Sequence, residues 1–303
     1  MWSSQLSGFS ATVPRELVHR RSVSEVFLTG FESVGPDAFQ VSVQWPRWHV
    51  FYRVADGTVD SALLVETMRQ ATILAAHAGY GVPLEHRFLM PTLSFDVPVG
   101  QQHHDLSVCP ELILQLGVNR ISPSGSRANA FEARGDLVLS GQTLAKATAG
   151  ARTLDPATYG RVRGPVSQAM PRPRAAVSGS AVGVVNNRNV VLGESRSPGS
   201  WPLLIDQTHP ILFDHPLDHV PGVLLIEAAR QATRIASGSA DSDITSFSGR
   251  FDKIVEFGDD PHVQVRLLTR GAGAIVTALL SIEAAGDRKA EFELAMAPGP
   301  RRR

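Results

Sequence analysis

Two segments of the chain carry the same three polar side chains at the same spacing. Residues 63–72 and 224–233 are identical at seven of ten positions and lie 161 residues apart. Each segment holds a carboxylate, a guanidinium and an amide at positions i, i+3 and i+4, namely Glu66, Arg69 and Gln70 and then Glu227, Arg230 and Gln231. On a helix these positions share one face. The carboxylate could act as a base there, and the arginine could bind an anion through two parallel hydrogen bonds.

The remaining residues of both segments are mostly apolar, so each predicted helix is expected to be buried over most of its circumference. Three interpretations of the Glu-x-x-Arg pairs then stand open. The pairs could be surface ion pairs, which contribute little stability. They could be buried structural pairs that hold two domains together, or they could form a duplicated site. The duplication favours the site, because burying polar groups is costly unless something requires them.

Histidines and a glycine precede the two segments. His209, His215 and His219 lie in the loop before Glu227, and His49 precedes Glu66. The histidine spacing matches no zinc pattern, and neither helix has two histidines four residues apart, so no metal is predicted. Gly222 stands at the expected start of the second helix. There it would let a ligand oxygen approach the first-turn N–H groups, which could stabilise an oxyanion.

The bulk composition indicates an ordinary soluble protein of two domains. The chain has 303 residues, 43% of them hydrophobic, with 29 basic and 29 acidic residues. This balance gives no overall charge that would recruit nucleic acid or a membrane. No apolar run approaches the length of a membrane span, so we expect a cytoplasmic protein. The 161-residue offset predicts domains at residues 1–164 and 165–303, with a linker at about 160–182.

The predicted elements indicate an α+β fold in each half. Helices are expected over residues 61–78 and 220–237. Strands are expected over residues 23–29, 39–43, 87–97, 112–119, 129–139 and 142–153 in the first half, and over 190–193, 245–257, 263–269, 274–284 and 290–297 in the second. A parallel arrangement would need helices between consecutive strands, and these are missing. One apolar helix followed by consecutive strands instead predicts a curved antiparallel sheet wrapped around a central helix.

These residues also carry a resemblance. His215-Pro216 and residues 221–231 look like the His…Pro-Gly-Val-Leu…Glu-Ala…Gln signature of hotdog-fold hydroxyacyl-carrier-protein dehydratases, except that the gap is shorter and Arg230 replaces a small residue. More closely, the chain resembles the A-factor biosynthesis hotdog family, the actinobacterial synthases of γ-butyrolactone-type autoregulators. The matching segments are residues 17–20, 24–29, 44–47, 49, 51–52, 66–70 and 88–90, and then 218–222 and 225–231.

The resemblance implies a tandem hotdog fold and an acyltransferase. A β-ketoacyl group would move from acyl carrier protein, or from acyl-CoA, to the hydroxyl of dihydroxyacetone phosphate, on the route to a butenolide, furan or lactone signal. No cofactor is implied. Dehydratases of this fold use a histidine from one hotdog and an acid from the other. By that likeness His215 would pair with Glu66, and His49 with Glu227. The chain would be a monomer with an internal pseudo-dimer, or a homodimer.

The residue types fit this chemistry. Glu66, Glu227, His215 and His49 are the expected catalytic residues, because a partly buried glutamate would have a raised pKa and could take the proton of an alcohol. The expected substrate-binding residues are Arg69, Arg230, Gln70, Gln231, His219 and Gly222. Two alternatives remain open: a dehydratase or thioesterase acting on acyl carrier protein, and a non-catalytic ligand-binding module. Arg69 and Arg230 have no evident role in dehydration.

Overall fold

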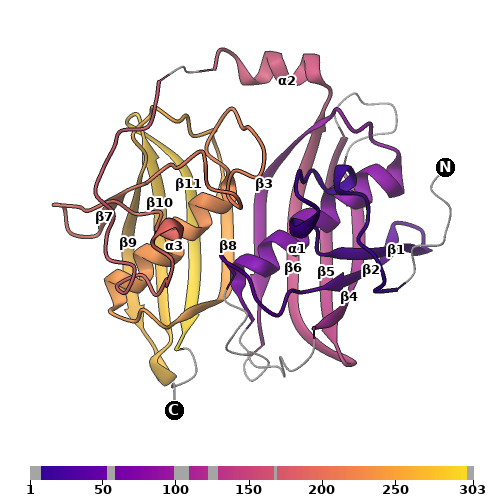
Figure 1. The fold of residues 1–303 in the computed structure, drawn as a ribbon, viewed down its shortest axis with the longest axis horizontal. Helices are drawn as coiled ribbons and strands as arrows, with labels where there is room; N and C mark the ends of the chain where they lie inside the picture. Colours follow the sequence, from indigo (N-terminus) through magenta and orange to yellow (C-terminus); the bar gives the residue numbers. More distant parts are fainter. Residues whose placement is uncertain (1–7, 53–58, 99–108, 122–128, 167–168, 299–303) are drawn as a thin grey trace. The chain divides into compact units, whose positions relative to one another are not determined.

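The computed structural model describes residues 8–52, 59–98, 109–121, 129–166 and 169–298. These residues form two compact units. Unit 1 comprises residues 1–49, 53–59 and 63–164, and unit 2 comprises residues 50–52, 60–62 and 165–303. Each unit combines one antiparallel sheet with one long helix (Figure 1).

The sheet of unit 1 has the strand order β1-β2-β4-β5-β6-β3, and every neighbouring pair is antiparallel. Its strands are β1 (Leu28–Gly35), β2 (Ala38–Gln44), β3 (Arg87–Asp96), β4 (Glu111–Arg120), β5 (Asn129–Leu139) and β6 (Gln142–Leu154). Alternate residues of β4 are buried, as expected of a strand that turns one face to a core. The buried side of this sheet receives helix α1.

Helix α1 (Ser61–Leu74) continues into a π-helical turn, Ala75–Gly79. Its start is capped by Asp60, whose carboxylate accepts the backbone N–H of Ala62 at 2.8 Å. Nearly every residue of the helix is buried. A Cβ added to Gly135 of β5 would lie 3.3 Å from the sulfur of Met68, so the missing side chain lets the helix approach the sheet closely.

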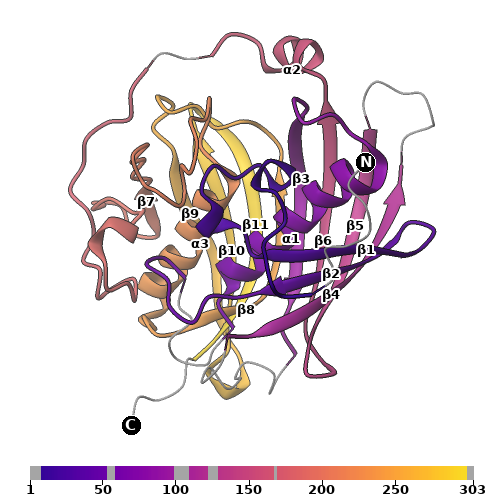
Figure 2. The same cartoon turned by 45° about the vertical axis from the view of Figure 1, so that its right-hand side comes forward.

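The sheet of unit 2 has the order β8-β11-β10-β9-β7 and is also antiparallel. Its strands are β7 (Ser200–Pro202), β8 (Asp243–Phe251), β9 (His262–Arg270), β10 (Val276–Ala284) and β11 (Asp287–Ala297). Helix α3 (Gly222–Ser237) packs on β8, β9 and β10 (Figure 2). It ends at Ser237 and is followed by Gly238, which adopts a left-handed conformation with φ of 66° that glycine adopts without strain.

Equivalent hairpins in the two units use the same turn. Ser140 and Gly141 join β5 to β6, and Ala285 and Gly286 join β10 to β11. All four residues have positive φ, between 50° and 80°. Two consecutive residues of positive φ match the right-handed twist of the flanking strands, which is why such turns are favoured in tight hairpins. The duplication therefore extends beyond the helix segments to the sheets.

The structure confirms the predicted α+β class, in which a curved antiparallel sheet accompanies one buried helix in each half. It corrects three details. Residues 190–193 form isolated bridges at Leu192 and Gly193 rather than a strand. The strand expected over residues 245–257 corresponds to β8, which ends at Phe251. A short helix, α2 (Pro156–Arg163), follows β6 and is capped by Asp155. Residues 23–29 were expected to be a strand, but Val23–Glu25 is a 3₁₀ turn and β1 begins only at Leu28.

Candidate functional site

Glu66 lies at the centre of a buried hydrogen-bond network in unit 1. Both arginines near it bind both of its carboxylate oxygens. Arg20 contributes Nε at 2.9 Å and a terminal nitrogen at 2.6 Å. Arg69 contributes Nε and Nη2, each at 2.9 Å. The Gln70 amide adds a fifth contact at 2.6 Å, so the carboxylate has no lone pair to spare.

The amide of Gln70 also anchors the chain segment that precedes β1. Its oxygen accepts the backbone N–H of Phe27 at 3.0 Å, and its nitrogen donates to the carbonyl of Glu25 at 2.7 Å. The side chain thus replaces the partner strand that these backbone groups would otherwise need. This explains why the predicted strand begins late: the polar backbone groups are satisfied by a helix side chain instead of a sheet neighbour.

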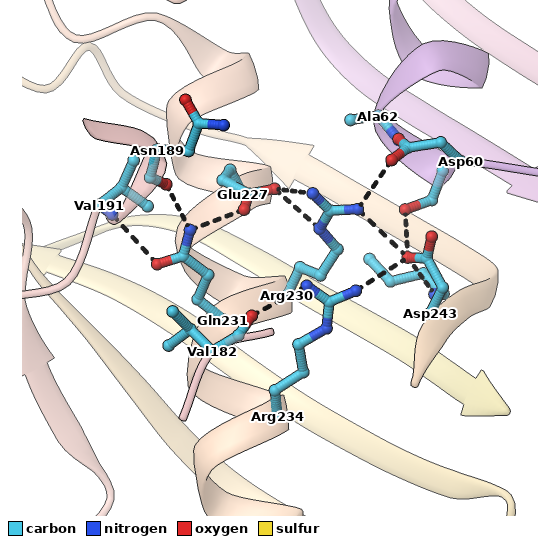
Figure 3. Close-up of polar contacts among 12 residues, drawn as sticks. Asp60, Ala62, Val182, Asn189, Val191, Glu227, Arg230, Gln231, Arg234 and Asp243 are labelled. Carbon is cyan, nitrogen blue, oxygen red and sulfur yellow. Dashed lines mark hydrogen bonds and ion pairs between the residues drawn. The ribbon is translucent and has the colours of Figure 1, made fainter. Parts of the chain in front are cut away.

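Glu227 occupies the corresponding place in unit 2 (Figure 3). Arg230 binds one carboxylate oxygen through Nε at 2.8 Å and Nη2 at 2.7 Å, and Gln231 donates to the other oxygen at 2.7 Å. Gln231 also accepts the N–H of Val191 at 3.0 Å and donates to the carbonyl of Asn189 at 2.8 Å. The two glutamines therefore make the same pair of backbone contacts, to residues i and i+2 of a preceding segment.

The arginines of the two networks differ in their partners and their exposure. Arg230 also lies 3.4 Å from the carboxylates of Asp60 and Asp243, and only 2% of its side chain is exposed (Figure 3). Arg69 instead bonds the carbonyl of Val18 at 3.2 Å, and 23% of its side chain is exposed. Arg69 therefore reaches solvent, whereas Arg230 is enclosed among protein carboxylates.

These surroundings shift the pKa values of Glu66 and Glu227 in opposite directions. Burial raises the pKa of Glu66, but the charges and hydrogen bonds of Arg20 and Arg69 outweigh it and lower the pKa to about 2. The expected raised pKa is therefore wrong for Glu66. Burial also raises the pKa of Glu227, and here it exceeds the opposing effects of Arg230, Arg234 and Gln231. The expectation holds for Glu227.

Each unit also pairs a histidine with the residue that its glutamine anchors. In unit 1, Nε2 of His49 lies 3.3 Å from a carboxylate oxygen of Glu25. In unit 2, Nε2 of His209 lies 3.2 Å from the side-chain oxygen of Asn189. The other nitrogen of His209 accepts two backbone N–H groups, from Ile211 and Leu212. Burial and the charge of Arg188 lower the pKa of His209 to about 4.

The remaining predicted residues lie in the loop that leads into α3. His215 contacts Asp214, and His219 contacts Asp218; both rings are partly exposed. Gly222 begins the helix after Pro221, which provides no side-chain cap for the first-turn N–H groups. The roles expected of these residues, and the pairing of His215 with Glu66 and of His49 with Glu227, stay predictions. Among the described residues, no cluster of His, Cys, Asp or Glu could hold a metal ion.

Sequence reasoning missed five residues that shape the two networks: Arg20, Glu25, Asp60, Asn189 and Asp243. Arg20 and Glu25 lie within segments that carried the family resemblance, and the signal at Asp60 is its place directly before the predicted helix at residues 61–78. Asn189 and Asp243 carry no local signal, because each reaches its helix through the tertiary fold.

Comparison with known proteins identifies relatives along both halves. The A-factor biosynthesis hotdog domain matches residues 1–155 and 166–244. A protein of Streptomyces virginiae named 2-oxo-3-(phosphooxy)propyl 3-oxoalkanoate synthase is 37% identical over 265 residues, which are 86% of this chain and 88% of the relative. A protein of the same name from Streptomyces coelicolor is 34% identical and covers 88% of this chain and 85% of its own length.

Solved structures share the fold at low sequence identity. The 12:0-ACP thioesterase from Umbellularia californica aligns with a TM-score of 0.55 and 13% identity, over 86% of this chain and 94% of its own. A putative oleoyl thioesterase from Lactobacillus plantarum aligns with a TM-score of 0.52 and 15% identity, over 88% and 100%. These likenesses show the double hotdog fold alone. No helix in the described part of the chain is long and apolar enough to cross a membrane. Because the domain match spans most of both halves, the chain belongs to the A-factor biosynthesis hotdog family.

Proposed function

We propose that this protein is an acyltransferase that moves a β-ketoacyl group from acyl carrier protein to the hydroxyl of dihydroxyacetone phosphate. The observation that carries the proposal is the 37% identity, over 86% of the chain, to a 2-oxo-3-(phosphooxy)propyl 3-oxoalkanoate synthase. That name describes a β-ketoacyl ester of a phosphorylated dihydroxyacetone. The ester would be the precursor of a γ-butyrolactone, butenolide or furan signal.

The reaction sets four tasks for the protein. The alcohol oxygen attacks the thioester carbonyl, a C–O bond forms and the C–S bond breaks. The hydroxyl must lose a proton, the departing thiolate must gain one, and the oxygen of the tetrahedral intermediate must be stabilised. In addition, the phosphate of the acceptor must be held so that its hydroxyl meets the carbonyl.

Unit 1 fits the phosphorylated acceptor better than unit 2. Arg69 is part-exposed and is held in place by Glu66, so its remaining donors can meet a phosphate. Glu66 serves this role as an ionised anchor, because its pKa of about 2 keeps it charged. Arg230 in unit 2 has no comparable freedom, since Glu227, Asp60 and Asp243 surround it.

Unit 2, taken by itself, holds groups suited to acyl-transfer chemistry. Glu227 is the repeated glutamate whose raised pKa fits a proton transfer, as a base toward the hydroxyl or as an acid toward the thiolate. The first turn of α3, at Gly222, lacks a side-chain cap and suits the oxyanion. Partly exposed His215 and His219 precede this turn and are proposed to act there. Gln70 and Gln231 hold the segments that flank the networks.

We further propose that the two hotdog domains correspond to residues 1–164 and 165–303, and that they work without a cofactor as a monomer or a homodimer in the cytoplasm.

The test is mass spectrometry of the product formed from purified protein, a panel of β-ketoacyl carrier proteins and dihydroxyacetone phosphate. The phosphorylated β-ketoester is the expected product, and its formation is expected to require the acceptor. Free β-keto acid without ester would identify a thioesterase instead. The Glu227→Gln variant should lose most ester formation while keeping its fold, and full activity of that variant would refute its assigned role.

A further inference from the structure

The strongest unassigned feature of unit 1 is a pair of facing histidines. Nε2 of His77 lies 2.9 Å from Nε2 of His19, and the ring of Phe88 makes edge contacts with both, at centroid distances of 5.2 and 5.3 Å. His77 belongs to the π-helical turn that continues α1, and it is only 7% exposed. In an inference that rests on the proposed function, we propose that the two histidines position the turn at residues 15–20 and, through it, the arginine that meets the acceptor's phosphate.

The contacts of His77 fix the direction of this hydrogen bond when both rings are neutral. Nδ1 of His77 lies 2.7 Å from the carbonyl oxygen of Val82, and because a carbonyl only accepts, Nδ1 carries the proton. A neutral imidazole with its proton on Nδ1 has its lone pair on Nε2. Nε2 of His19 therefore donates to Nε2 of His77. The backbone thus orients His77, and His77 in turn orients His19.

The turn that contains His19 contacts the proposed phosphate site through both neighbours of the histidine. The carbonyl of Val18 accepts a hydrogen bond from Nη2 of Arg69 at 3.2 Å, and Nε of Arg20 donates to Glu66 at 2.9 Å. Glu66 also binds Arg69. A displacement of this turn would therefore move the donors of Arg69 away from a bound phosphate, and small displacements of a binding group reduce its effect strongly.

Unit 2 contains the same turn with a glycine in the place of His19. The backbone hydrogen bonds of the two turns match: they run from His19 to Glu16 at 3.4 Å and from Arg20 to Arg15 at 3.0 Å in unit 1, and from Gly183 to Ser180 at 3.4 Å and from Val184 to Gly179 at 2.9 Å in unit 2. Both His19 and Gly183 are left-handed, with φ of 51° and 66°. Glycine adopts this conformation without strain, whereas a residue with a Cβ does not. Stability of the turn alone would favour glycine, so the histidine in unit 1 indicates a role for its ring.

The two units hold this turn through different helix residues. In unit 2 the buried Arg234 of α3 donates to the carbonyl of Val182 at 3.0 Å. Val182 is the counterpart of Val18, because each directly precedes the left-handed residue of its turn. The residue 161 positions before Arg234 is Ile73, whose side chain has no donor. In unit 1 the turn is instead held from four residues further along the helix, by His77. The histidine pair thus does in unit 1 what a buried arginine does in unit 2.

Variants of the pair separate positioning from folding, with binding of dihydroxyacetone phosphate measured by calorimetry beside ester formation. His19→Gly reproduces the turn of unit 2, so its resistance to urea should be equal to or higher than that of the parent. Its Kd and KM for dihydroxyacetone phosphate should nevertheless rise about 10-fold, with kcat changed less than about twofold. His77→Leu should weaken binding equally, and His77→Gln should recover most of the affinity, because its amide oxygen can accept from His19. In the His77→Leu background, His19→Gly should cause no further loss.

A control and a second measurement keep the outcomes separate. Ser140→Gly places glycine at another left-handed position of unit 1, in a hairpin, and should keep the affinity of the parent. The ¹⁵N shifts of the unaltered protein at pH 8 should show His77 protonated on Nδ1, whether or not the variants fold. Parent affinity in His19→Gly, His77→Gln as weak as His77→Leu, or a neutral His77 protonated on Nε2 would overturn the inference. Protein that binds dihydroxyacetone phosphate as expected but makes no ester would refute the proposed acyl transfer alone.

Discussion

The two copies of the Glu-Arg-Gln motif share their local geometry and differ in their electrostatics. In unit 1, Glu66 is one carboxylate held by two arginines, Arg20 and Arg69. In unit 2 a single arginine side chain, Arg230, instead contacts three carboxylates, those of Glu227, Asp60 and Asp243. The first arrangement stabilises a negative charge and leaves an arginine part-exposed. The second places Arg230 and Arg234 among three carboxylates and leaves Glu227 with a raised pKa.

The comparison shows which part of the duplicated motif the two copies share and which part differs between them. The glutamine contact to the preceding segment is retained in both copies, which makes it the common structural element. Only the partners supplied by distant residues differ, and they set the direction in which the pKa of each glutamate is shifted. The following predictions test this division.

The largest loss of stability is expected from replacing Arg230, which contacts the carboxylates of Glu227, Asp60 and Asp243. Arg230→Met leaves Glu227 and Asp60 buried without their cation, and we expect a loss of about 3–5 kcal/mol in the free energy of unfolding. Arg69→Met should cost less, about 1.5–3 kcal/mol, because Arg20 still binds Glu66. Urea denaturation at pH 7 measures both values. Equal losses would show that the two networks are electrostatically alike.

The next effect is the response of stability to pH. The folded pKa of Glu66, about 2, lies below its ordinary value of 4.5, so its stabilisation is complete above about pH 4.5 and is lost as the pH falls toward 2. That contribution is about 3 kcal/mol. Glu227 has a raised pKa, so its contribution is present below pH 4.5 and is lost as the pH rises through the folded pKa.

The variants Glu66→Gln and Glu227→Gln should therefore change the pH profile in opposite senses. Glu66→Gln should flatten the loss of stability in acid, between about pH 4.5 and 2, and Glu227→Gln should flatten a loss that develops above pH 4.5. Urea denaturation between pH 2 and 7 gives both slopes. If both variants changed the slope of the unfolding free energy against pH in the same direction, the comparison of the two units would be contradicted.

A smaller loss of stability, similar in the two units, is expected when the glutamine that both copies share is replaced. Gln70→Ala leaves the carbonyl of Glu25 and the N–H of Phe27 without their partner, and Gln231→Ala does the same to Asn189 and Val191. Each should cost about 1–3 kcal/mol. Hydrogen exchange should report faster exchange at the N–H groups of Phe27 and Val191. Unchanged exchange in either variant would show that the glutamine does not hold that segment.

The smallest expected change concerns His209. Because its pKa is lowered to about 4, the ring should stay neutral at pH 5, where an ordinary histidine is charged. Its neutral form is favoured in the folded protein, so its contribution to stability is present above its ordinary pKa of 6.5 and is lost as the pH falls toward 4. An NMR titration of the imidazole measures this directly. A midpoint near 6.5 would argue against its structural role.

Several elements could be predicted from the sequence alone. Strand β5 has the predicted bounds, and α3 ends at Ser237 as expected, because alternation and a terminal glycine are local signals. The strand expected at residues 23–29 was wrong in its first half. Alternation indicates an extended segment, but it does not say whether a strand or the amide of Gln70 will satisfy its backbone groups.

The sequence by itself determined the duplication, the fold class, the family and the face that Glu66, Arg69 and Gln70 share with their counterparts. These follow from helical spacing, which fixes neighbours three and four residues apart. Only the tertiary structure decided the direction in which the pKa of each glutamate is shifted. Arg20 reaches Glu66 across 46 residues, and Asp60 reaches Arg230 across 170. The pKa of a buried group depends on the charges around it in space, and those charges come from distant parts of the chain.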